Sequence, residues 1–136
     1  MSTPLLIIGN KNYSSWSLRP WILMKVLDLA FDEKLIPMFD ENWDAVIAAV
    51  SPSGKVPVLI DDGHTVWETM AILEYLHDRH PDAGVWPADR LARAVARSAA
   101  NEMHGGFGGL RSAMPMNTRK VLPGRGRDES SLKDIE

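Results

Sequence analysis

The chain has 136 residues, with 15 Lys and Arg, 18 Asp and Glu, and no cysteine. This length fits one domain, or one domain and part of another, and a hydrophobic fraction of 45% is typical of a folded protein. The absence of cysteine excludes disulfides, cysteine–zinc sites and a protein thiol nucleophile, and a formal net charge of −3 argues against nucleic acid as a partner.

Apolar runs in this sequence are short. None approaches the roughly 20 residues that a helix needs to cross a bilayer, and Met1 to Pro4 lead into only four apolar residues, which is too few for a signal peptide. We therefore expect a cytoplasmic protein without a membrane partner.

The first 80 residues alternate between strand and helix patterns. The apolar run Leu5-Leu6-Ile7-Ile8 predicts a buried strand, and apolar residues at helical spacing from Leu18 to Leu29 predict a helix that begins after the serines at 14, 15 and 17. Residues 33–38 predict a second strand, and residues 43–50 a short helix.

A hairpin and a helix complete this part of the chain. Residues 56–60 and 64–67 predict two strands joined by an Asp-Asp-Gly turn, and Thr69 opens a helix that ends near His80. The order β-α-β-α-β-β-α predicts an α/β fold with a mixed sheet and helices on both faces.

Charge and composition change near His80-Pro81-Asp82-Ala83-Gly84, where Pro and Gly break regular structure. We predict a domain over residues 1–80, a linker over 81–88 and a partial helical domain over 89–136. Residues 89–103 predict a helix, and four glycines between 105 and 109 should kink or fray its continuation toward Met114. The last six residues resemble the start of another helix. One helix and a stub cannot enclose a core, so we expect a fragment or a chain that needs a partner.

Three segments carry candidate chemistry. Tyr13-Ser14-Ser15-Trp16-Ser17 places hydroxyls before a helix N-terminus, where they either cap the helix or donate a hydrogen bond to a thiolate or oxyanion. In Lys55-Val56-Pro57, the proline either starts a strand in the trans form or, as a cis proline, leaves an edge for an extended peptide. Glu68-Thr69 is either a capping pair or a holder for the amino and carboxylate ends of a ligand.

Taken together, these segments resemble the thioredoxin-like N-terminal domain of cytosolic glutathione transferases. The resemblance covers residues 4–80 and is most specific in SSWSLRPW (14–21), KVPVLIDDG (55–63) and ETMAILEYL (68–76). The serine loop is similar to that of the zeta and tau classes, although Trp16 stands where zeta members have cysteine, and Thr69 where serine is usual. Residues 86–120 resemble the first helix of the family's all-helical C-terminal domain, so the chain resembles a C-terminally truncated member.

The resemblance implies roles for individual residues. Ser14, five positions before Arg19, would be catalytic, with Ser15 as the reserve candidate. The backbone of Val56, before a cis Pro57, would pair with the cysteinyl unit of glutathione, Glu68 and Thr69 would hold its γ-glutamyl end, and Lys55 would reach the glycyl carboxylate. The family also implies a homodimer, which we expect to be impaired here because most of the second domain is absent.

The implied activity is that of a glutathione transferase. Glutathione would be the co-substrate, without a metal, and a serine hydroxyl would stabilise its thiolate for addition to an electrophilic small molecule. Two alternatives stay open: a non-catalytic module for protein interaction or ligand binding, and a glutathione-dependent isomerase similar to maleylacetoacetate isomerase.

The sequence gives less support to other functions and other candidate sites. A thioredoxin or glutaredoxin needs the cysteine that this chain lacks, and a serine hydrolase needs a Gly-x-Ser-x-Gly motif. His104 has no second metal ligand at helical spacing, so we expect no metal site there. Met103, Met114 and Met116 with Phe107 would line an apolar acceptor pocket or pack against helices that are absent.

Overall fold

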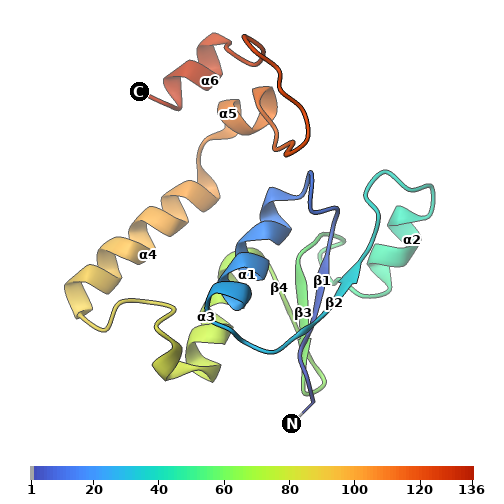
Figure 1. The fold of residues 1–136 in the computed structure, drawn as a ribbon, viewed down its shortest axis with the longest axis vertical. Coiled ribbons are helices and arrows are strands. Elements are labelled where there is room, and N and C mark those ends of the chain that lie inside the picture. Colours follow the sequence, from blue (N-terminus) through green and yellow to red (C-terminus); the bar gives the residue numbers. More distant parts are fainter. Residues whose placement is uncertain (1) are drawn as a thin grey trace.

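The computed structural model describes residues 2–136. Figure 1 shows a sheet and its helices in the first part of the chain, with a helical arm leading away from them. The strands are β1 (Leu5–Ile8), β2 (Asp32–Leu35), β3 (Val58–Asp61) and β4 (His64–Trp67). The helices are α1 (Ser15–Val26), α2 (Trp43–Ala48), α3 (Thr69–Arg79), α4 (Arg90–Gly105), α5 (Gly108–Ala113) and α6 (Glu129–Lys133), with a 3-10 turn over Pro81–Ala83.

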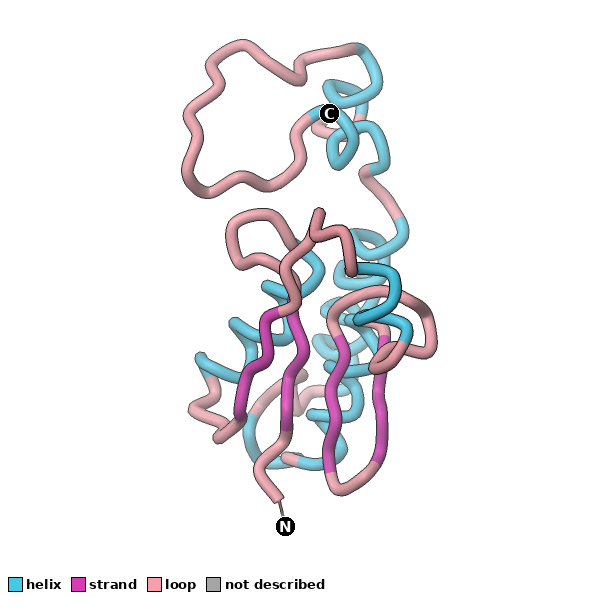
Figure 2. Tube along the Cα trace, turned by 90° about the vertical axis from the view of Figure 1, so that its right-hand side faces the viewer, coloured by secondary structure: helices cyan, strands magenta, loops and turns pink. Residues whose placement is uncertain are grey.

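The four strands form one mixed sheet in the order β2-β1-β3-β4 (Figure 2). β1 pairs parallel to β2 and antiparallel to β3, with Leu6 opposite Leu59. β3 and β4 form the predicted hairpin, whose turn residues Asp62 and Gly63 both have positive φ angles, of 44° and 80°. Two positive φ angles match the twist of a two-residue hairpin turn, which is why the Asp-Gly pair directs this connection.

Alternate residues of the central strands supply two cores. Leu6 and Ile8 of β1 pack with buried residues of α1, β3 and α3, and Ile7 packs on the opposite face with Ile47 of α2. Side chains alternate along a strand, so a fully apolar strand such as β1 must be covered on both faces. The prediction of an α/β fold with helices on both faces is confirmed.

Several element boundaries differ from the prediction, among them those of α1, β2 and β3. The helix predicted to reach Leu29 ends at Val26, because Asp28 has a φ of 52°, which a right-handed helix does not accommodate. The strand predicted at 33–38 spans Asp32–Leu35, and all four of its side chains are exposed. The strand predicted at 56–60 starts at Val58, since Pro57 has no amide hydrogen for the ladder.

The arm consists of α4, α5 and α6 with their connecting loops. Asp89 caps the N-terminus of α4, because the Asp89 carboxylate accepts a hydrogen bond from the amide of Ala92 at 2.8 Å. The predicted glycine kink is a complete break, because α4 ends at Gly105 and Phe107 has a φ of 61° before α5 starts. Arg97 of α4 makes two hydrogen bonds to Glu74 of α3, at 2.9 and 2.6 Å, and these join the arm to the sheet domain. Within residues 2–136, no helix has the length and apolar character required to span a membrane.

Candidate functional site

The serine segment lies where the chain passes from the end of β1 into α1. The amides of Tyr13 and Ser14 both donate to the carbonyl of Asn10, at 3.0 and 2.9 Å, which closes a tight turn before the helix. The Asn10 side chain in turn accepts a hydrogen bond from the amide of Met38 at 2.7 Å. This turn fixes the position from which the serines approach the N-terminus of α1.

Ser14 is the N-cap of α1. Its Oγ accepts a hydrogen bond from the amide of Ser17 at 3.3 Å and donates to Ser17 Oγ at 2.8 Å, and Ser17 Oγ accepts from the amide of Gly9 at 3.1 Å. Only 5% of Ser14 is exposed. The hydroxyl of Ser14 therefore serves as a cap and belongs to a short buried chain of hydrogen bonds that begins at β1.

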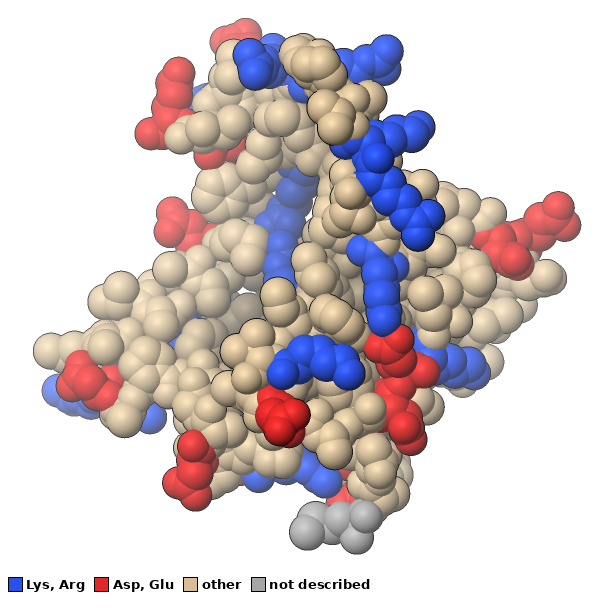
Figure 3. Space-filling model, in the orientation of Figure 1, with Lys and Arg blue, Asp and Glu red and all other residues tan. Residues whose placement is uncertain are grey.

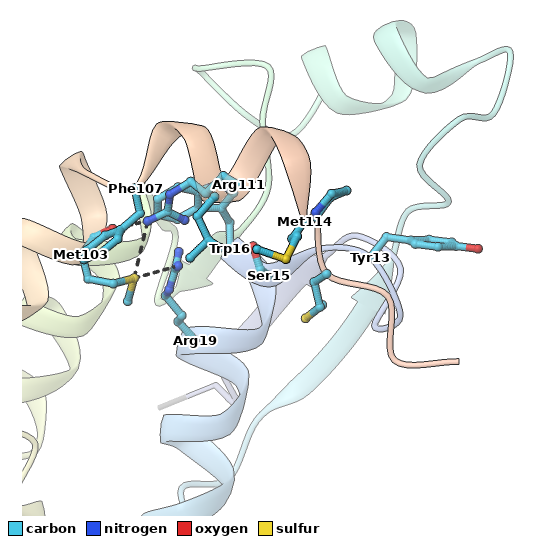
Figure 4. Close-up of a pocket in the computed structure, with 11 residues that line it drawn as sticks. Tyr13, Ser15, Trp16, Arg19, Met103, Phe107, Arg111 and Met114 are labelled. Atoms are coloured by element: carbon cyan, nitrogen blue, oxygen red, sulfur yellow. Dashed lines mark hydrogen bonds between the residues drawn. The ribbon is translucent and has the colours of Figure 1, made fainter. Parts of the chain in front are cut away.

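Ser15 faces a different environment. Together with Tyr13, Trp16 and Arg19 it lines a cavity of about 450 Å³ between α1 and the arm, which we call the Trp16 pocket. The other residues that line this pocket are Met103, Phe107, Leu110, Arg111, Met114, Pro115 and Met116. The structure thus separates the two serines: Ser14 is buried in its hydrogen bonds with Ser17, and Ser15 lies beside the pocket (Figure 4).

The remaining sequence-predicted residues gather in a second cavity, of about 210 Å³, which we call the Pro57 cavity. It is lined by Lys55, Val56, Pro57, Glu68 and Thr69, with Trp16 and His104. The Val56–Pro57 peptide bond is cis. Residues from the start of β3 and the start of α3 are therefore brought together beside the N-terminal turn of α1.

Side-chain hydrogen bonds hold the walls of the Pro57 cavity in place. Ser51 Oγ accepts from the amide of Lys55 at 3.1 Å and donates to its carbonyl at 2.7 Å. Thr69, which is 1% exposed, donates its hydroxyl proton to the carbonyl of Trp16 at 3.2 Å. This last bond joins the start of α3 to the start of α1, so the two helix N-termini have a fixed spacing.

His104 is also a wall of the Pro57 cavity, which its sequence context did not predict. Its Nε2 lies 3.5 Å from the Glu68 carboxylate, and its ring meets Trp16 edge to face with 4.9 Å between centroids. The sequence around His104 indicates only that it lacks a second metal ligand at helical spacing. No local pattern signals its contact with Glu68, because α4 lies beside the cavity only through the tertiary fold.

Trp16 lies between the two cavities, and the guanidinium groups of two arginines pack against its ring. The guanidinium carbon of Arg19 lies 4.0 Å from the Trp16 ring centroid and that of Arg111 lies 4.4 Å from it. Burial, and then repulsion from Arg111, lowers the pKa of Arg19 below its usual value. Figure 4 shows both arginines beside Trp16, with dashed hydrogen bonds to Met103. Met103, Phe107, Met114 and Met116, for which the sequence left a pocket lining or packing against other helices open, all line the Trp16 pocket.

Comparison with known proteins gives the same family from sequence and from structure. The family model described as "Glutathione S-transferase, N-terminal domain" matches residues 13–79. The chain is 29% identical over 119 residues to a probable maleylacetoacetate isomerase of Caenorhabditis elegans, covering 88% of this chain and 52% of that protein. It is 40% identical over 87 residues to the maleylacetoacetate isomerase of Dictyostelium discoideum, covering 62% of this chain and 40% of that protein.

Solved structures agree. A glutathione transferase homologue from Burkholderia, with bound glutathione, superimposes with a TM-score of 0.70 at 28% identity, covering 80% of this chain and 57% of that one. A glutathione S-transferase from the Antarctic clam Laternula elliptica gives a TM-score of 0.68 at 25% identity, covering 82% and 50%. The chain spans about half the length of the curated relatives that it matches.

Proposed function

Residues 13–79 belong to the glutathione S-transferase N-terminal domain family, and on this basis we propose that the protein binds glutathione and activates its thiol for addition to an electrophilic small molecule. The observation that carries the proposal is the Pro57 cavity, where five residues from two separate segments converge beside the N-terminus of α1. Relatives of the same fold have been crystallised with bound glutathione.

The cavity suits the two ends of a γ-glutamyl peptide. The Glu68 carboxylate would take the γ-glutamyl ammonium, and the backbone amide of Thr69 at the start of α3 would donate to its carboxylate, since the Thr69 hydroxyl already donates to the carbonyl of Trp16. The backbone of Val56 would pair with the cysteinyl unit, and the ammonium of Lys55 would attract the glycyl carboxylate. The thiol would then lie toward the serine segment.

Activation of that thiol requires stabilisation of its charged form. A thiol of pKa ~8.5 is only a few per cent thiolate at pH 7, and lowering the pKa by ~2 units takes ~2.7 kcal/mol. One hydrogen bond to a charged group supplies about 1.5–3 kcal/mol, and a helix N-terminus adds about 0.3–1 kcal/mol. A serine donor at the N-terminus of α1 is therefore sufficient.

We assign the donor role to Ser14, supported by its hydrogen bonds with Ser17. Ser17 Oγ already accepts from the amide of Gly9, so its own hydroxyl proton is free to turn toward Ser14 Oγ. Ser14 would then accept from Ser17 and donate its proton to the thiolate, so the bond between the two serines would be kept with its direction reversed and a stronger, charged hydrogen bond would be added. Ser15 is the second candidate, because it already lines the Trp16 pocket.

The acceptor would bind in the Trp16 pocket, which shares the Trp16 side chain with the Pro57 cavity. The thiolate would form a carbon–sulfur bond with the electrophilic carbon, and either a leaving group would depart with its electron pair or the new carbanion would take a proton from water. No base is needed for the serine, since it does not attack.

Two single substitutions test the assignment. Ser14→Ala should lower conjugation of glutathione to 1-chloro-2,4-dinitrobenzene by at least tenfold while leaving glutathione affinity in titration calorimetry nearly unchanged, because the serine contact matters after ionisation. Ser98→Ala, at an exposed position of α4, is the matched control. Loss of activity in Ser15→Ala alone would move the role by one residue, and absence of glutathione binding to the folded wild-type protein would refute the proposal.

The names of the relatives favour a second activity, a glutathione-dependent isomerase. In that reaction the thiolate adds to a double bond, the single bond rotates, and the thiolate leaves again, so the same residues would serve. Isomerisation of maleylacetoacetate without net consumption of glutathione would support this activity. Glutathione binding without turnover of either substrate type would support a non-catalytic module.

The family expectation for assembly and location forms part of the proposal. We propose a cytoplasmic protein whose homodimer, as in relatives of the family, would join the first domain of one subunit to the second of the other. We also keep the proposed division into residues 1–80, 81–88 and 89–136. Light scattering measures the assembly, and limited proteolysis measures the division, with first cleavage expected in residues 81–88.

A further inference from the structure

The Trp16 pocket contains two positive charges without a carboxylate partner. Arg19 of α1 and Arg111 of α5 both lie against the ring of Trp16, and within residues 2–136 neither forms a salt bridge. Most basic side chains of this protein lie at its surface, and Figure 3 shows blue basic atoms also in the hollow between the arm and the sheet domain. Like charges in one partly buried place repel each other, so this arrangement favours an anion.

The neutral partners of the two arginines do not offset their charge. Arg111 donates from Nε to the carbonyl of Gly106 at 3.0 Å and from Nη2 to the carbonyl of Met103, both at the end of α4. Arg19 donates to Met103 Sδ at 3.0 Å, and its Nη1 is buried without a hydrogen-bond partner in the structure. Carbonyl and thioether groups position the guanidiniums and leave a net positive field in the pocket.

The rest of the pocket is apolar. Met103, Phe107, Leu110 and Met114 form much of its wall. Charges act more strongly beside such walls than in water, because the local dielectric constant is lower. A ligand that satisfies both features has a negative group near the arginines and a flat apolar body against the methionine and aromatic side chains.

We propose that the acceptor substrate of the Trp16 pocket is an anion, an electrophile that carries a carboxylate on a flat apolar body. The proposal rests on the proposed function, and it narrows the substrate class. Arg111 is the principal carboxylate partner and Arg19 adds to the positive field. The aromatic body then lies toward the methionines, and the electrophilic carbon lies toward Ser15 and the glutathione thiol.

A pair of aromatic chlorides tests this substrate class. In 4-chloro-3,5-dinitrobenzoate the thiolate sulfur bonds to the chlorine-bearing carbon, chloride leaves with its electron pair, and the thiol proton goes to solvent; the methyl ester reacts at the same carbon without the negative charge. After division by the uncatalysed rates, kcat/KM should be about tenfold higher for the acid than for the ester, the size expected from one charge-assisted contact. Equal values or a preference for the ester would overturn the proposal.

Binding without glutathione separates this inference from the proposed function. In calorimetry, 3,5-dinitrobenzoate should bind wild-type protein about tenfold more tightly than its methyl ester, and the preference should fall when salt is raised from about 20 mM to about 0.5 M. An ester that binds as tightly as the acid would show that the arginines only brace α1 against the arm. Glutathione conjugation of both compounds without preference would overturn this inference alone. Absent glutathione binding would overturn the proposed function and with it the role of the anion as acceptor substrate, while a retained preference for 3,5-dinitrobenzoate would still show that the pocket binds anions.

Three variants test which side chain causes the preference for the acid over its methyl ester. Arg111→Lys should retain the preference for the acid and Arg111→Gln should remove most of it, while Arg119→Gln, at an exposed loop position, should leave it unchanged. Circular dichroism checks that each variant is folded. If Arg111→Gln does not fold, Arg19→Gln and the salt dependence of the wild type test the proposal instead. A preference for the acid that does not change with salt would overturn it.

Discussion

Ser17 Oγ lies 2.8 Å from Ser14 Oγ, and this buried contact connects the cap of α1 to the end of β1 through the amide of Gly9. The cap and the proposed thiol donor are therefore the same residue, and a second, buried serine holds its hydroxyl in place. Substitution of Ser17 therefore measures the contribution of these hydrogen bonds to the free energy of unfolding, apart from the proposed donation by Ser14 to the thiolate.

Ser17→Ala should lower the free energy of unfolding by about 1–3 kcal/mol, because the Gly9 amide and the Ser14 hydroxyl both lose a buried partner. Ser98→Ala, at an exposed position, should change it by less than about 0.5 kcal/mol. Urea unfolding followed by tryptophan fluorescence measures both. A Ser17→Ala protein as stable as the control would show that the buried hydrogen bonds contribute nothing net.

Gly109 and Gly108 are adjacent in α5 but face different surroundings. A Cβ at Gly109 would lie 2.6 Å from the carbonyl oxygen of Ser130 in α6, whereas a Cβ at Gly108 meets nothing within 4 Å. Gly109→Ala should push α6 away from α5 and expose the arm to protease. Gly108→Ala should protect it slightly, by about 0.4–1 kcal/mol.

Limited proteolysis followed by mass spectrometry distinguishes the two variants through cleavage between residues 105 and 136. Faster cleavage in Gly109→Ala and equal or slower cleavage in Gly108→Ala are expected. The same cleavage rate in both variants would contradict the packing of α5 on α6.

Arg97 and Glu74 form the bidentate pair that joins α4 to α3, with both side chains close to 40% exposed. An ion pair this exposed contributes only about 0.2–1 kcal/mol, and salt screens it. A double-mutant cycle with Arg97→Gln and Glu74→Gln should give a coupling in that range at low salt and near zero at 1 M. Arg90→Gln, at an exposed position of α4, is the control, and a coupling unaffected by salt would contradict an electrostatic tether.

The environment of Tyr75 predicts how the free energy of unfolding changes with pH in the alkaline range. Burial, and then its hydrogen bond to Asp61 at 2.9 Å, raises the pKa of the Tyr75 phenol above its usual value. A raised pKa in the folded state means that stability is fully present below the unfolded pKa of about 10 and is lost as pH rises through the folded pKa.

Tyr75→Phe should therefore lose stability below pH 10 and show a smaller further decrease between about pH 9.5 and 11 than the wild type. Tyr13→Phe, whose ring is 42% exposed, controls for loss of a hydroxyl that has no such partner. Urea titrations across this pH range measure the difference. Parallel curves for wild type and Tyr75→Phe would contradict the prediction.

Local patterns predicted much of the sheet domain. The apolar run of β1, the Asp62-Gly63 turn and the helical spacing of α3 each depend on neighbours a few residues away, so they could be read from the sequence. β2 could not be placed correctly, because Asp32, Glu33 and Lys34 are exposed and charged. Those residues become a strand through their ladder with β1, which is a long-range interaction.

The candidate site divides in the same way. Resemblance of three motifs to one family selected the residues of the Pro57 cavity and both serines, and the structure brings the five cavity residues together. The hydroxyl direction of Ser14, however, follows from its bonds with Ser17, which spacing alone does not reveal.

The sequence by itself determined the order of the elements, since periodicity and turn chemistry act over a few neighbouring positions, and its resemblance to one family selected the residues that we propose to hold a γ-glutamyl peptide. Only the tertiary structure decided that His104 lies against Glu68 and that Arg19 and Arg111 share the ring of Trp16. The contact of His104 with Glu68 joins residues 36 positions apart and that of Arg111 with Trp16 joins residues 95 positions apart, and both exist because the arm packs back over α1. Packing of distant segments, and the electric field that it creates, leave no local pattern in the chain.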